Sequence, residues 1–202
     1  MMIQGTDEWK LARAGKVTAS RIADALSFVK GAEGASRVNY RLELVTERLT
    51  GQPVESFTNS YMEWGTQQEP FAREAYEKAR LEFVVETGFI DHPSIPMSGA
   101  SPDGLVGSDA IIEIKCPKSN THLSYITDDK IPEKYKKQMM WQLICTGRKY
   151  CEFVSYDPRF PENLQLFIKR FEPEPEELLK LESEVAVFLA TVDELENKLR
   201  NF

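Results

Sequence analysis

Apolar residues recur at every third or fourth position in four stretches of the chain, a spacing that predicts amphipathic helices. These stretches are residues 37–50, 60–80, 132–146 and 174–200. Gly51 and Gly147 follow the first and third stretches, as is typical where a helix ends. Gly65 and Pro70 interrupt the second stretch, so its first part is a candidate separate turn. The last stretch predicts a long helix that packs on the body of the protein or on another subunit.

Alternating or β-branched residues predict strands in five further stretches. They are residues 81–90, 97–100, 109–115, 150–156 and 165–171. We expect the first three to form a three-stranded meander. Polar residues predict connections at 30–37 and 121–130, the first of them glycine-rich and mobile. This order of elements predicts an α+β body, in which one central sheet carries a site at its edge and a helix packs against it.

The stretch from Gly99 to Ser119 contains the residues around which the rest of the chain is organised. Side chains two apart in a strand share a face, so Glu113 and Lys115 point the same way. Two glycines and a serine within residues 104–108 predict a hairpin turn that brings Asp103 beside Glu113. The sequence therefore predicts two carboxylates and one ammonium group at the end of a hairpin.

Two carboxylates and a lysine suit the hydrolysis of a phosphodiester. Carboxylate oxygens bind Mg²⁺ and leave positions open for water and a phosphate. The ion lowers the pKa of bound water, and the lysine orients or deprotonates the attacking water and stabilises charge in the transition state. The alternative is a solvated hairpin with ordinary surface charges, because an aspartate followed by Glu-x-Lys is a common pattern.

Two other positions each carry a functional and a structural interpretation. Arg13 precedes Thr18 and Ser20, which are candidate N-caps of a helix at 22–26. A helix N-terminus with hydroxyls and an arginine can bind a phosphate, whereas the structural interpretation is a plain cap beside a surface arginine. Glu69 is either a carboxylate near a helix start, where the helix dipole favours it, or a further acidic residue at the metal site.

Composition limits the class of protein. The chain has 202 residues, of which 42% are hydrophobic and 28% charged, as is typical of one globular domain. No stretch is apolar enough for a membrane helix, the first residues lack a secretion signal, and three cysteines without metal spacing suit a reducing cytoplasm. The net charge of −7 argues against a protein that coats DNA, but not against a nuclease with a local basic groove.

Several motifs together resemble a known nuclease family. Ser-Pro-Asp-Gly-Leu at 101–105 followed by Glu-Ile-Lys-Cys-Pro at 113–117 is similar to the phage lambda-type exonuclease, or YqaJ viral recombinase family, of the PD-(D/E)xK nuclease superfamily. Further matches are Arg13 with Gly15 and Thr18-Ala19-Ser20, Trp64-Gly65 with Glu69, Gln138 with Thr146-Gly147, and Tyr156-Asp157-Pro158-Arg159. These matches lie in order and span nearly the whole chain.

The resemblance implies a fold and a domain organisation. The expected fold is a restriction-endonuclease-like core of the α+β class (α/β by some schemes), with a central mixed sheet flanked by helices and a long C-terminal helix. Residues 1–202 would form a single nuclease domain. Its catalytic core would lie at about 60–171, its N-terminal helical part at 1–59 and its C-terminal helix at 174–200.

The resemblance also implies an activity and partners. The expected protein is a Mg²⁺-dependent exonuclease, with Mn²⁺ as a substitute ion, that degrades the 5′-ended strand of double-stranded DNA in the 5′-to-3′ direction. The 3′ single-stranded tails would serve phage-type recombination together with a single-strand annealing protein. We further expect a homotrimer ring around the DNA, a phage or prophage origin, the cytoplasm of a bacterial host as its location, and no membrane association.

By resemblance, the catalytic roles fall on matching residues. Metal would be bound by Asp103, Glu113, the backbone carbonyl of Ile114 and Glu69, the last of these at a second metal directly or through water. Lys115 would position or activate the attacking water, and Gln138 would hold the lysine or the water in place.

By the same resemblance, a second group of residues would hold the DNA end. The 5′-phosphate would be bound by Arg13, Ser20 and Ser101. Trp9 and Met62 lie where the family places apolar residues that help to split the terminal base pair, although a hydrophobic core would also favour apolar residues there.

Two alternatives remain open from the sequence. An endonuclease or structure-specific nuclease on the same core would use the same catalytic residues. A non-catalytic DNA-end-binding protein on a decayed nuclease scaffold is the other, and the intact Asp103, Glu113, Lys115 and Gln138 argue against it.

Overall fold

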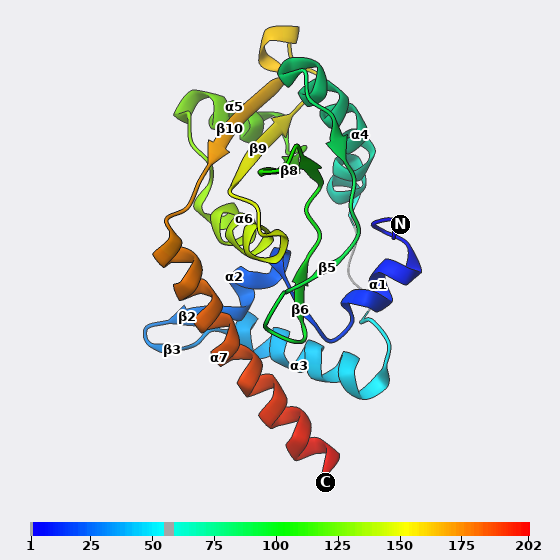
Figure 1. The fold of residues 1–202 in the computed structure, drawn as a ribbon, viewed down its shortest axis with the longest axis vertical. Helices are drawn as coiled ribbons and strands as arrows, with labels where there is room; N and C mark the ends of the chain where they lie inside the picture. Colours follow the sequence, from blue (N-terminus) through cyan, green and yellow to red (C-terminus); the bar gives the residue numbers. More distant parts are fainter. Residues whose placement is uncertain (1, 55–58) are drawn as a thin grey trace.

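The structure, a computed structural model, describes residues 2–54 and 59–202. Its centre is a five-stranded sheet in the order β10–β9–β8–β7–β4 (Figure 1). The strands are β4 (Val84–Val85), β7 (Gly104–Val106), β8 (Ala110–Lys115), β9 (Tyr150–Tyr156) and β10 (Leu166–Phe171). β8 runs parallel to β9 and antiparallel to β7, so the sheet is mixed and confirms the predicted α+β class.

Helices surround this sheet in the described part of the chain. They are α1 (Asp7–Arg13), α2 (Ile22–Ala25), α3 (Ala35–Thr50), α4 (Ser60–Arg80), α5 (Ser119–Asp128), α6 (Glu133–Thr146) and α7 (Pro175–Arg200), with short 3₁₀ helices η1 (Ala19–Arg21) and η2 (Glu162–Leu164). The four helices predicted from apolar spacing are confirmed, each within two residues at either end. α4 is continuous, so the separate turn expected before Pro70 is absent from it.

The two faces of the five-stranded sheet are both covered. α4 packs on one face, where Tyr76 contacts the cluster around Ile112 and Ile114 of β8. α5 and α6 pack on the other face, where Met139 contacts the cluster around Ile111. Because successive side chains of β8 alternate between the faces, the odd-numbered positions point toward α6. The site therefore forms between the sheet and α6 rather than on a solvated hairpin.

The expected three-stranded meander is wrong. Residues 81–90 divide into β4, which pairs with β7, and β5 (Ile90–Asp91), which pairs with β6 (Ser98–Ala100). β6 also pairs with β1 (Val17–Thr18), so β1, β6 and β5 form a second sheet. Where the chain leaves the first sheet, between β4 and β5, Gln4 donates to the Thr87 carbonyl, with 3.0 Å between Nε2 and O, and the N-terminal segment packs against Gly88.

The expected polar connections at 30–37 and 121–130 are also wrong. Lys30 and Gly31 both have positive φ, as a two-residue hairpin turn between β2 (Phe28–Val29) and β3 (Ala32–Glu33) requires, and α3 begins shortly after it. Residues 119–128 form α5, which buries few side chains. One of them is His122, which is hydrogen bonded to Ser155 with 2.7 Å between Nδ1 and Oγ. A helix that buries so little gives no apolar periodicity to detect.

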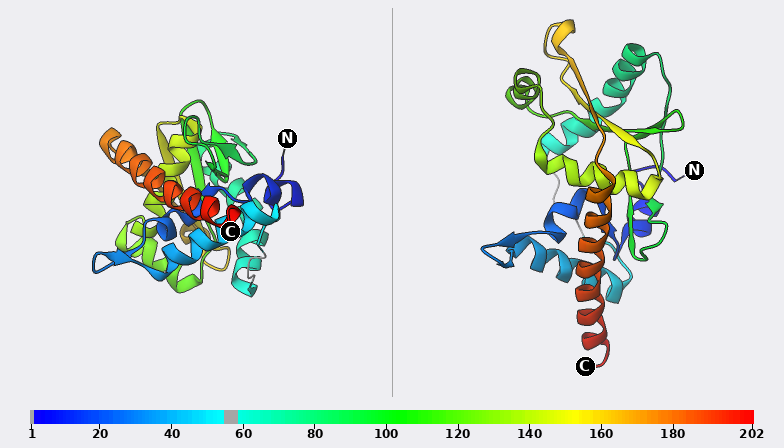
Figure 2. Two further views of the ribbon diagram at one scale, coloured as in Figure 1. Left: turned by 90° about the horizontal axis from the view of Figure 1, so that it is seen from below. Right: turned by 60° about the vertical axis from the view of Figure 1, so that its left-hand side comes forward.

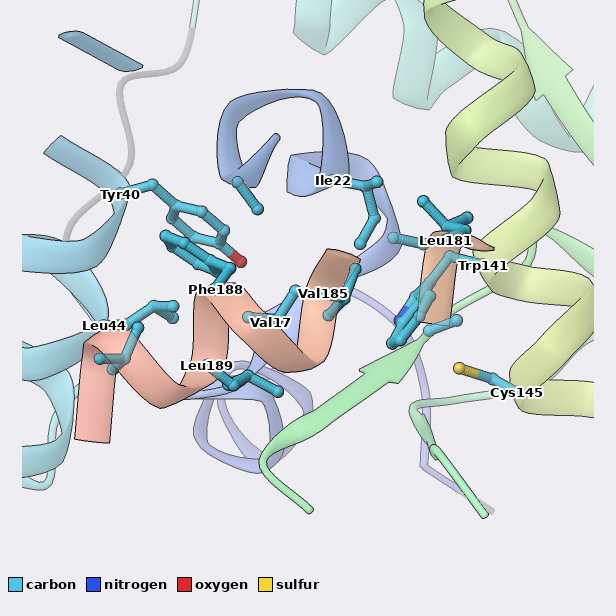
Figure 3. Close-up of a cluster of buried hydrophobic side chains, with 14 of the residues drawn as sticks. Val17, Ile22, Tyr40, Leu44, Trp141, Cys145, Leu181, Val185, Phe188 and Leu189 are labelled. Atoms are coloured by element: carbon cyan, nitrogen blue, oxygen red, sulfur yellow. The ribbon is translucent and has the colours of Figure 1, made fainter. Parts of the chain in front are cut away.

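The N-terminal and C-terminal parts share one hydrophobic cluster, which Figure 3 shows in close-up. Tyr40 of α3 stacks on Phe188 of α7 with 5.7 Å between ring centroids. Trp141 of α6 is fully buried in the same cluster, so α6 is anchored there and against the sheet. α7 crosses α3 and carries the C-terminus away from the sheet (Figures 1 and 2). These contacts confirm packing of α7 on the body.

Among the helices that the structure describes, none combines the length and the hydropathy needed to cross a membrane.

Candidate active site

Strand β8 places two charged side chains on one face. Lys115 Nζ forms an ion pair with Glu113 Oε1, as side chains two residues apart on a strand can. The Glu113 side chain is fully buried, whereas the Lys115 side chain is 27% exposed. β8 is the middle strand of the sheet, so the site lies at the C-terminal end of a central strand.

Asp103 joins this pair through the backbone of β8. Its Oδ2 accepts a hydrogen bond from the Ile114 N–H, with 2.6 Å between the oxygen and the nitrogen. Extending the β7–β8 register would set Pro102 opposite Ile114, but proline has no N–H to donate. The Pro102 carbonyl instead accepts from Gln4, with 2.8 Å between Nε2 and O. The Ile114 carbonyl is therefore left without a ladder partner from β7 in the described chain, free for another ligand.

Gly104, the residue after Asp103, is required by close packing. A Cβ at this position would lie 2.1 Å from Cγ1 of Val84 on the neighbouring strand. The Pro-Asp-Gly sequence thus ends the ladder, supplies a carboxylate and lets β4 approach.

The carboxylate of Glu113 is held from both sides by α6. Gln138 donates to Oε1 and Gln142 donates to Oε2, each with 2.6 Å between Nε2 and the oxygen. The two glutamines are four residues apart and so project from the same side of the helix. Burial of a carboxylate is costly without hydrogen-bond donors, and these amides with Lys115 supply three.

The negative charges of the site act on one another. Burial raises the pKa of Asp103 well above its ordinary value, and the charges of Glu113 and Glu69 raise it further. Burial also raises the pKa of Glu69, although Arg73 opposes this from 3.3 Å. The carboxylates gathered in the described site therefore favour the binding of a positively charged species.

Lys115 is held as an ammonium group. Burial lowers the pKa of Lys115, but the carboxylates of Glu113 and Asp103 raise it by more, so the pKa lies above its ordinary value. Its Nζ also lies 5.2 Å from the ring centroid of Tyr135 on α6. This environment favours a role in orienting water and stabilising charge over a role as a base.

Two adjoining cavities meet at Asp103 and Lys115. The larger, about 430 Å³, is named here the α4 cavity and is lined by residues that include Glu69, Met62 and Ile114. The smaller, about 270 Å³, is named the α1 cavity; its lining includes five further predicted residues, Trp9, Arg13, Ser20, Ser101 and Gln138, together with Glu113. Each predicted site residue therefore lines one or both cavities.

The α1 cavity has a wall built from α1 and the segment before β7. Trp9 donates to Ser101, with 2.9 Å between Nε1 and Oγ. The guanidinium carbon of Arg13 lies 3.8 Å from the centroid of the Trp9 ring, and the buried Nε of Arg13 has no partner among the described residues. Burial lowers the pKa of Arg13 from its ordinary value. A half-buried arginine that stacks on an aromatic ring and has an Nε without an acceptor in the described chain is suited to an anion.

The cap interpretation of Thr18 and Ser20 is wrong in one respect. Neither hydroxyl caps a helix: Thr18 stands at the N-cap position of η1 without a side-chain hydrogen bond to the backbone, and α2 also lacks a side-chain cap. The two hydroxyl oxygens lie 3.5 Å apart in the wall of the α1 cavity. They are therefore placed toward a ligand space rather than used in the helix start.

Comparison with known proteins identifies the family. A family model described as the YqaJ-like viral recombinase domain matches residues 8–149. The chain belongs to this family. A search of the curated proteins found no match.

Solved structures place this YqaJ-like chain beside exonucleases. LHK-Exo, an alkaline exonuclease from Laribacter hongkongensis, is 46% identical, and two of its crystal structures, one of them in complex with dAMP, cover 97% of each chain with TM-scores of 0.90 and 0.91. A phage related exonuclease from Haemophilus somnus 129PT is 16% identical, with a TM-score of 0.73 over 91% of this chain and 96% of that chain, which shows a shared fold. The family and the first relative support a nuclease role.

The oxygen donors of the YqaJ-like site fit a hard divalent cation. Asp103, Glu113 and the Ile114 carbonyl offer oxygens only, and Mg²⁺ commonly takes one or two protein carboxylates while keeping several waters. Within residues 2–54 and 59–202, no three His, Cys, Asp or Glu side chains cluster closely enough to hold an ion by themselves.

Sequence reasoning missed one residue that contacts Glu113 directly. Gln142 lies one helical turn beyond Gln138, and this i, i+4 spacing of two glutamines on a helix with an otherwise apolar inner face is the signal that could have found it. Tyr135, which no motif assigned to the site, lines the α4 cavity beside Lys115. Gln4, which also lines the α1 cavity, carries no pattern that the sequence alone reveals.

Proposed function

We propose that this protein is a Mg²⁺-dependent exonuclease that degrades the 5′-ended strand of double-stranded DNA in the 5′-to-3′ direction. The observation that carries the proposal is the assembly of Asp103, Glu113 and Lys115 at the junction of the two cavities. The family membership and the 46% identity to an alkaline exonuclease support the same class of reaction.

The residues of the chain divide the chemistry between them. Asp103, Glu113 and the Ile114 carbonyl would hold Mg²⁺, with Glu69 contacting a second metal directly or through water. Mg²⁺, or Mn²⁺ in its place, would supply a more acidic water and neutralise charge on the phosphate. Lys115, as an ammonium group, orients the attacking water and stabilises the negative charge of the transition state.

Gln138 lies between the carboxylate and the substrate space. Its amide donates to Glu113 and its side chain lines the α1 cavity. It thereby fixes the Glu113 carboxylate, with which Lys115 also forms an ion pair. It so limits the positions that the Lys115 side chain can take. This is an indirect form of the role expected from the sequence, in which Gln138 holds the lysine or the water.

The α1 cavity is suited to the 5′-phosphate of the strand that is degraded. The Arg13 guanidinium group, whose buried Nε has no hydrogen-bond partner among the described residues, and the hydroxyls of Ser20 and Ser101 are donors that a phosphate requires. The relative solved in complex with dAMP binds a mononucleotide, the kind of product that such an enzyme releases. Trp9 in this cavity and Met62 in the α4 cavity would help to separate the terminal base pair.

The proposal extends to assembly and partners. A homotrimer ring would keep the enzyme on its DNA between cuts, and a single-strand annealing protein would receive the 3′ tails. The protein would act in the cytoplasm of a bacterial host, as a product of a phage or prophage.

One digestion experiment tests the proposal. A blunt duplex is labelled at each 5′ end and each 3′ end in turn and incubated with and without Mg²⁺. The expected result is release of the 5′ label as mononucleotide, only when Mg²⁺ is present, with the 3′ label retained on long single strands. Internal fragments without end degradation would favour an endonuclease, and binding without digestion would favour a DNA-end-binding protein; either result contradicts the proposal.

A further inference from the structure

Gln142 is a buried polar residue with one identifiable partner. Its side chain is fully inaccessible to solvent and lies on α6 between Trp141 and Leu143, both buried in the core. Its amide nitrogen lies 2.6 Å from Glu113 Oε2, and its own Oε1 has no hydrogen-bond partner among the described residues. The unpaired Oε1 destabilises the folded protein, whereas the amide nitrogen forms one hydrogen bond to a carboxylate of the site.

The two oxygens of Glu113 are treated differently. Oε1 accepts a hydrogen bond from the Gln138 amide and forms an ion pair with the Lys115 ammonium group, and both of these side chains line a cavity. Among the described residues, Oε2 accepts a side-chain hydrogen bond from the Gln142 amide alone, and Gln142 lines neither cavity. Gln142 is therefore out of reach of substrate and can act on the reaction only through Glu113.

We infer that Gln142 is a positioning residue that fixes the Glu113 carboxylate in the orientation needed to bind Mg²⁺. This inference rests on the proposed function and adds to it a residue behind the site. A carboxylate held by an amide at one oxygen and by a second amide and an ammonium group at the other has little freedom to rotate. Hydrogen bonds behind a metal ligand of this kind typically contribute about 10- to 100-fold to metal affinity or activity.

A purely structural role makes a different prediction. If Gln142 served only the packing of α6, its replacement by an apolar side chain of similar length would change the stability of the protein and leave Mg²⁺ affinity alone. The amide of Gln142 makes the hydrogen bond to Glu113, so the two roles separate when the amide is removed and the volume is kept.

Two variants and a control test this. Gln142→Met keeps the length of the side chain and removes the donor, and Gln142→Asn keeps the amide but shortens its reach by one methylene. Met139→Leu is the matched control, because Met139 is also fully buried on α6 but packs in the sheet-facing cluster. For each protein we would measure Mg²⁺ binding by calorimetry without DNA, the Mg²⁺ concentration for half-maximal duplex digestion, and the unfolding temperature.

The expected result is a loss of about 10- to 100-fold in Mg²⁺ affinity for Gln142→Met, with a matching rise in the half-maximal Mg²⁺ concentration and with digestion largely recovered at saturating Mg²⁺. Gln142→Asn should shift the Mg²⁺ affinity and the half-maximal Mg²⁺ concentration in the same directions. Met139→Leu should leave both of these quantities unchanged. A folded Gln142→Met or Gln142→Asn protein with wild-type Mg²⁺ affinity would overturn the inference, even if its unfolding temperature had changed. A wild-type protein without Mg²⁺-dependent digestion would instead contradict the proposed function itself.

Discussion

Asp103 accepts the backbone N–H of Ile114, with 2.6 Å between Oδ2 and N, at the point where the β7–β8 ladder stops. The contact pairs the Ile114 N–H, because the Pro102 carbonyl that the ladder would offer accepts from Gln4 instead, and it sets the carboxylate beside Glu113. Proline has no N–H to donate, so β7 offers no ladder donor to the Ile114 carbonyl in the described chain. The Pro-Asp pair therefore has a structural cause: proline ends the ladder, and aspartate caps the exposed donor.

The role assigned to Lys115 predicts a large effect on the chemical step. Lys115→Met keeps the aliphatic stem and removes the charge, so digestion of a blunt duplex should fall by about 10²- to 10⁴-fold. Binding of the duplex, measured by gel shift, should persist. Lys149→Met is the control, because Lys149 pairs with a carboxylate at the other end of the same hairpin, 3.0 Å from Asp109. Near wild-type digestion by the Lys115 variant would remove the assigned mechanism.

The phosphate site predicts a preference for phosphorylated ends. A duplex with 5′-phosphates should be digested about 10- to 100-fold faster than the same duplex after phosphatase treatment, because the phosphate accepts charge-assisted hydrogen bonds. Arg13→Leu should abolish this preference, while retaining apolar contact with the Trp9 ring. Lys10→Ala, on the exposed side of the same helix, should retain it. A preference that survives in the Arg13 variant would place the phosphate elsewhere.

The shared cluster of α3 and α7 predicts a strong dependence of stability on Phe188. Phe188→Ala removes a fully buried ring that stacks on Tyr40, and should lower the free energy of unfolding by about 3–5 kcal/mol. Val187→Ala, one residue earlier and 63% exposed, should change it by less than about 0.5 kcal/mol. Urea unfolding of both variants checks this. Equal effects would mean that α7 is not packed on α3 in solution.

Glu33 predicts a pH dependence of stability. Arg41 and Arg37 lower its pKa from 4.5 to about 2, through hydrogen bonds that the ionised carboxylate accepts. A lowered folded-state pKa gives stability that is complete above pH 4.5 and is lost as the pH falls through about 2. Because the Glu33 side chain is 36% exposed, screening reduces this contribution to about 1 kcal/mol.

The Glu33→Gln variant tests that dependence. Its free energy of unfolding should fall less steeply than that of the wild type between pH 4.5 and pH 2.5. Glu184→Gln is the control, since the Glu184 carboxylate faces Lys180 at 4.0 Å on the exposed side of α7. Parallel pH curves for the wild type and Glu33→Gln would show that Arg37 and Arg41 of α3 do not hold this carboxylate.

The sequence predicted elements whose burial is periodic. α4 and α6 each carry a repeating inner face, and the glycine after α6 has the left-handed conformation expected of a helix end. α5 was not predicted because it is short and buries few side chains, of which His122 is held by hydrogen bonds that no spacing predicts. Strands of two residues, such as β4 and β5, lie below the length at which alternation can be read.

The site was predicted better than the sheet that holds it. Glu113 and Lys115 share a face by strand geometry alone, and the ion pair confirms it. Their neighbours on α6 depend on tertiary packing between a helix and a strand far apart in the chain. Gln138 was found through the family motif, whereas Gln142 belongs to no motif, and its contact with Glu113 follows from the packing of α6 against β8.

The central claim is that Asp103 contributes its charge to a metal-dependent hydrolysis of DNA. Asp103→Asn tests it most directly, because the amide oxygen can still accept the Ile114 N–H while the charge is lost. The measurement is the rate of mononucleotide release from a 5′-phosphorylated blunt duplex with Mg²⁺, beside duplex binding without it. We predict a loss of at least ~10²-fold in rate with binding retained within a few-fold. Release at the wild-type rate by the folded variant would contradict the account.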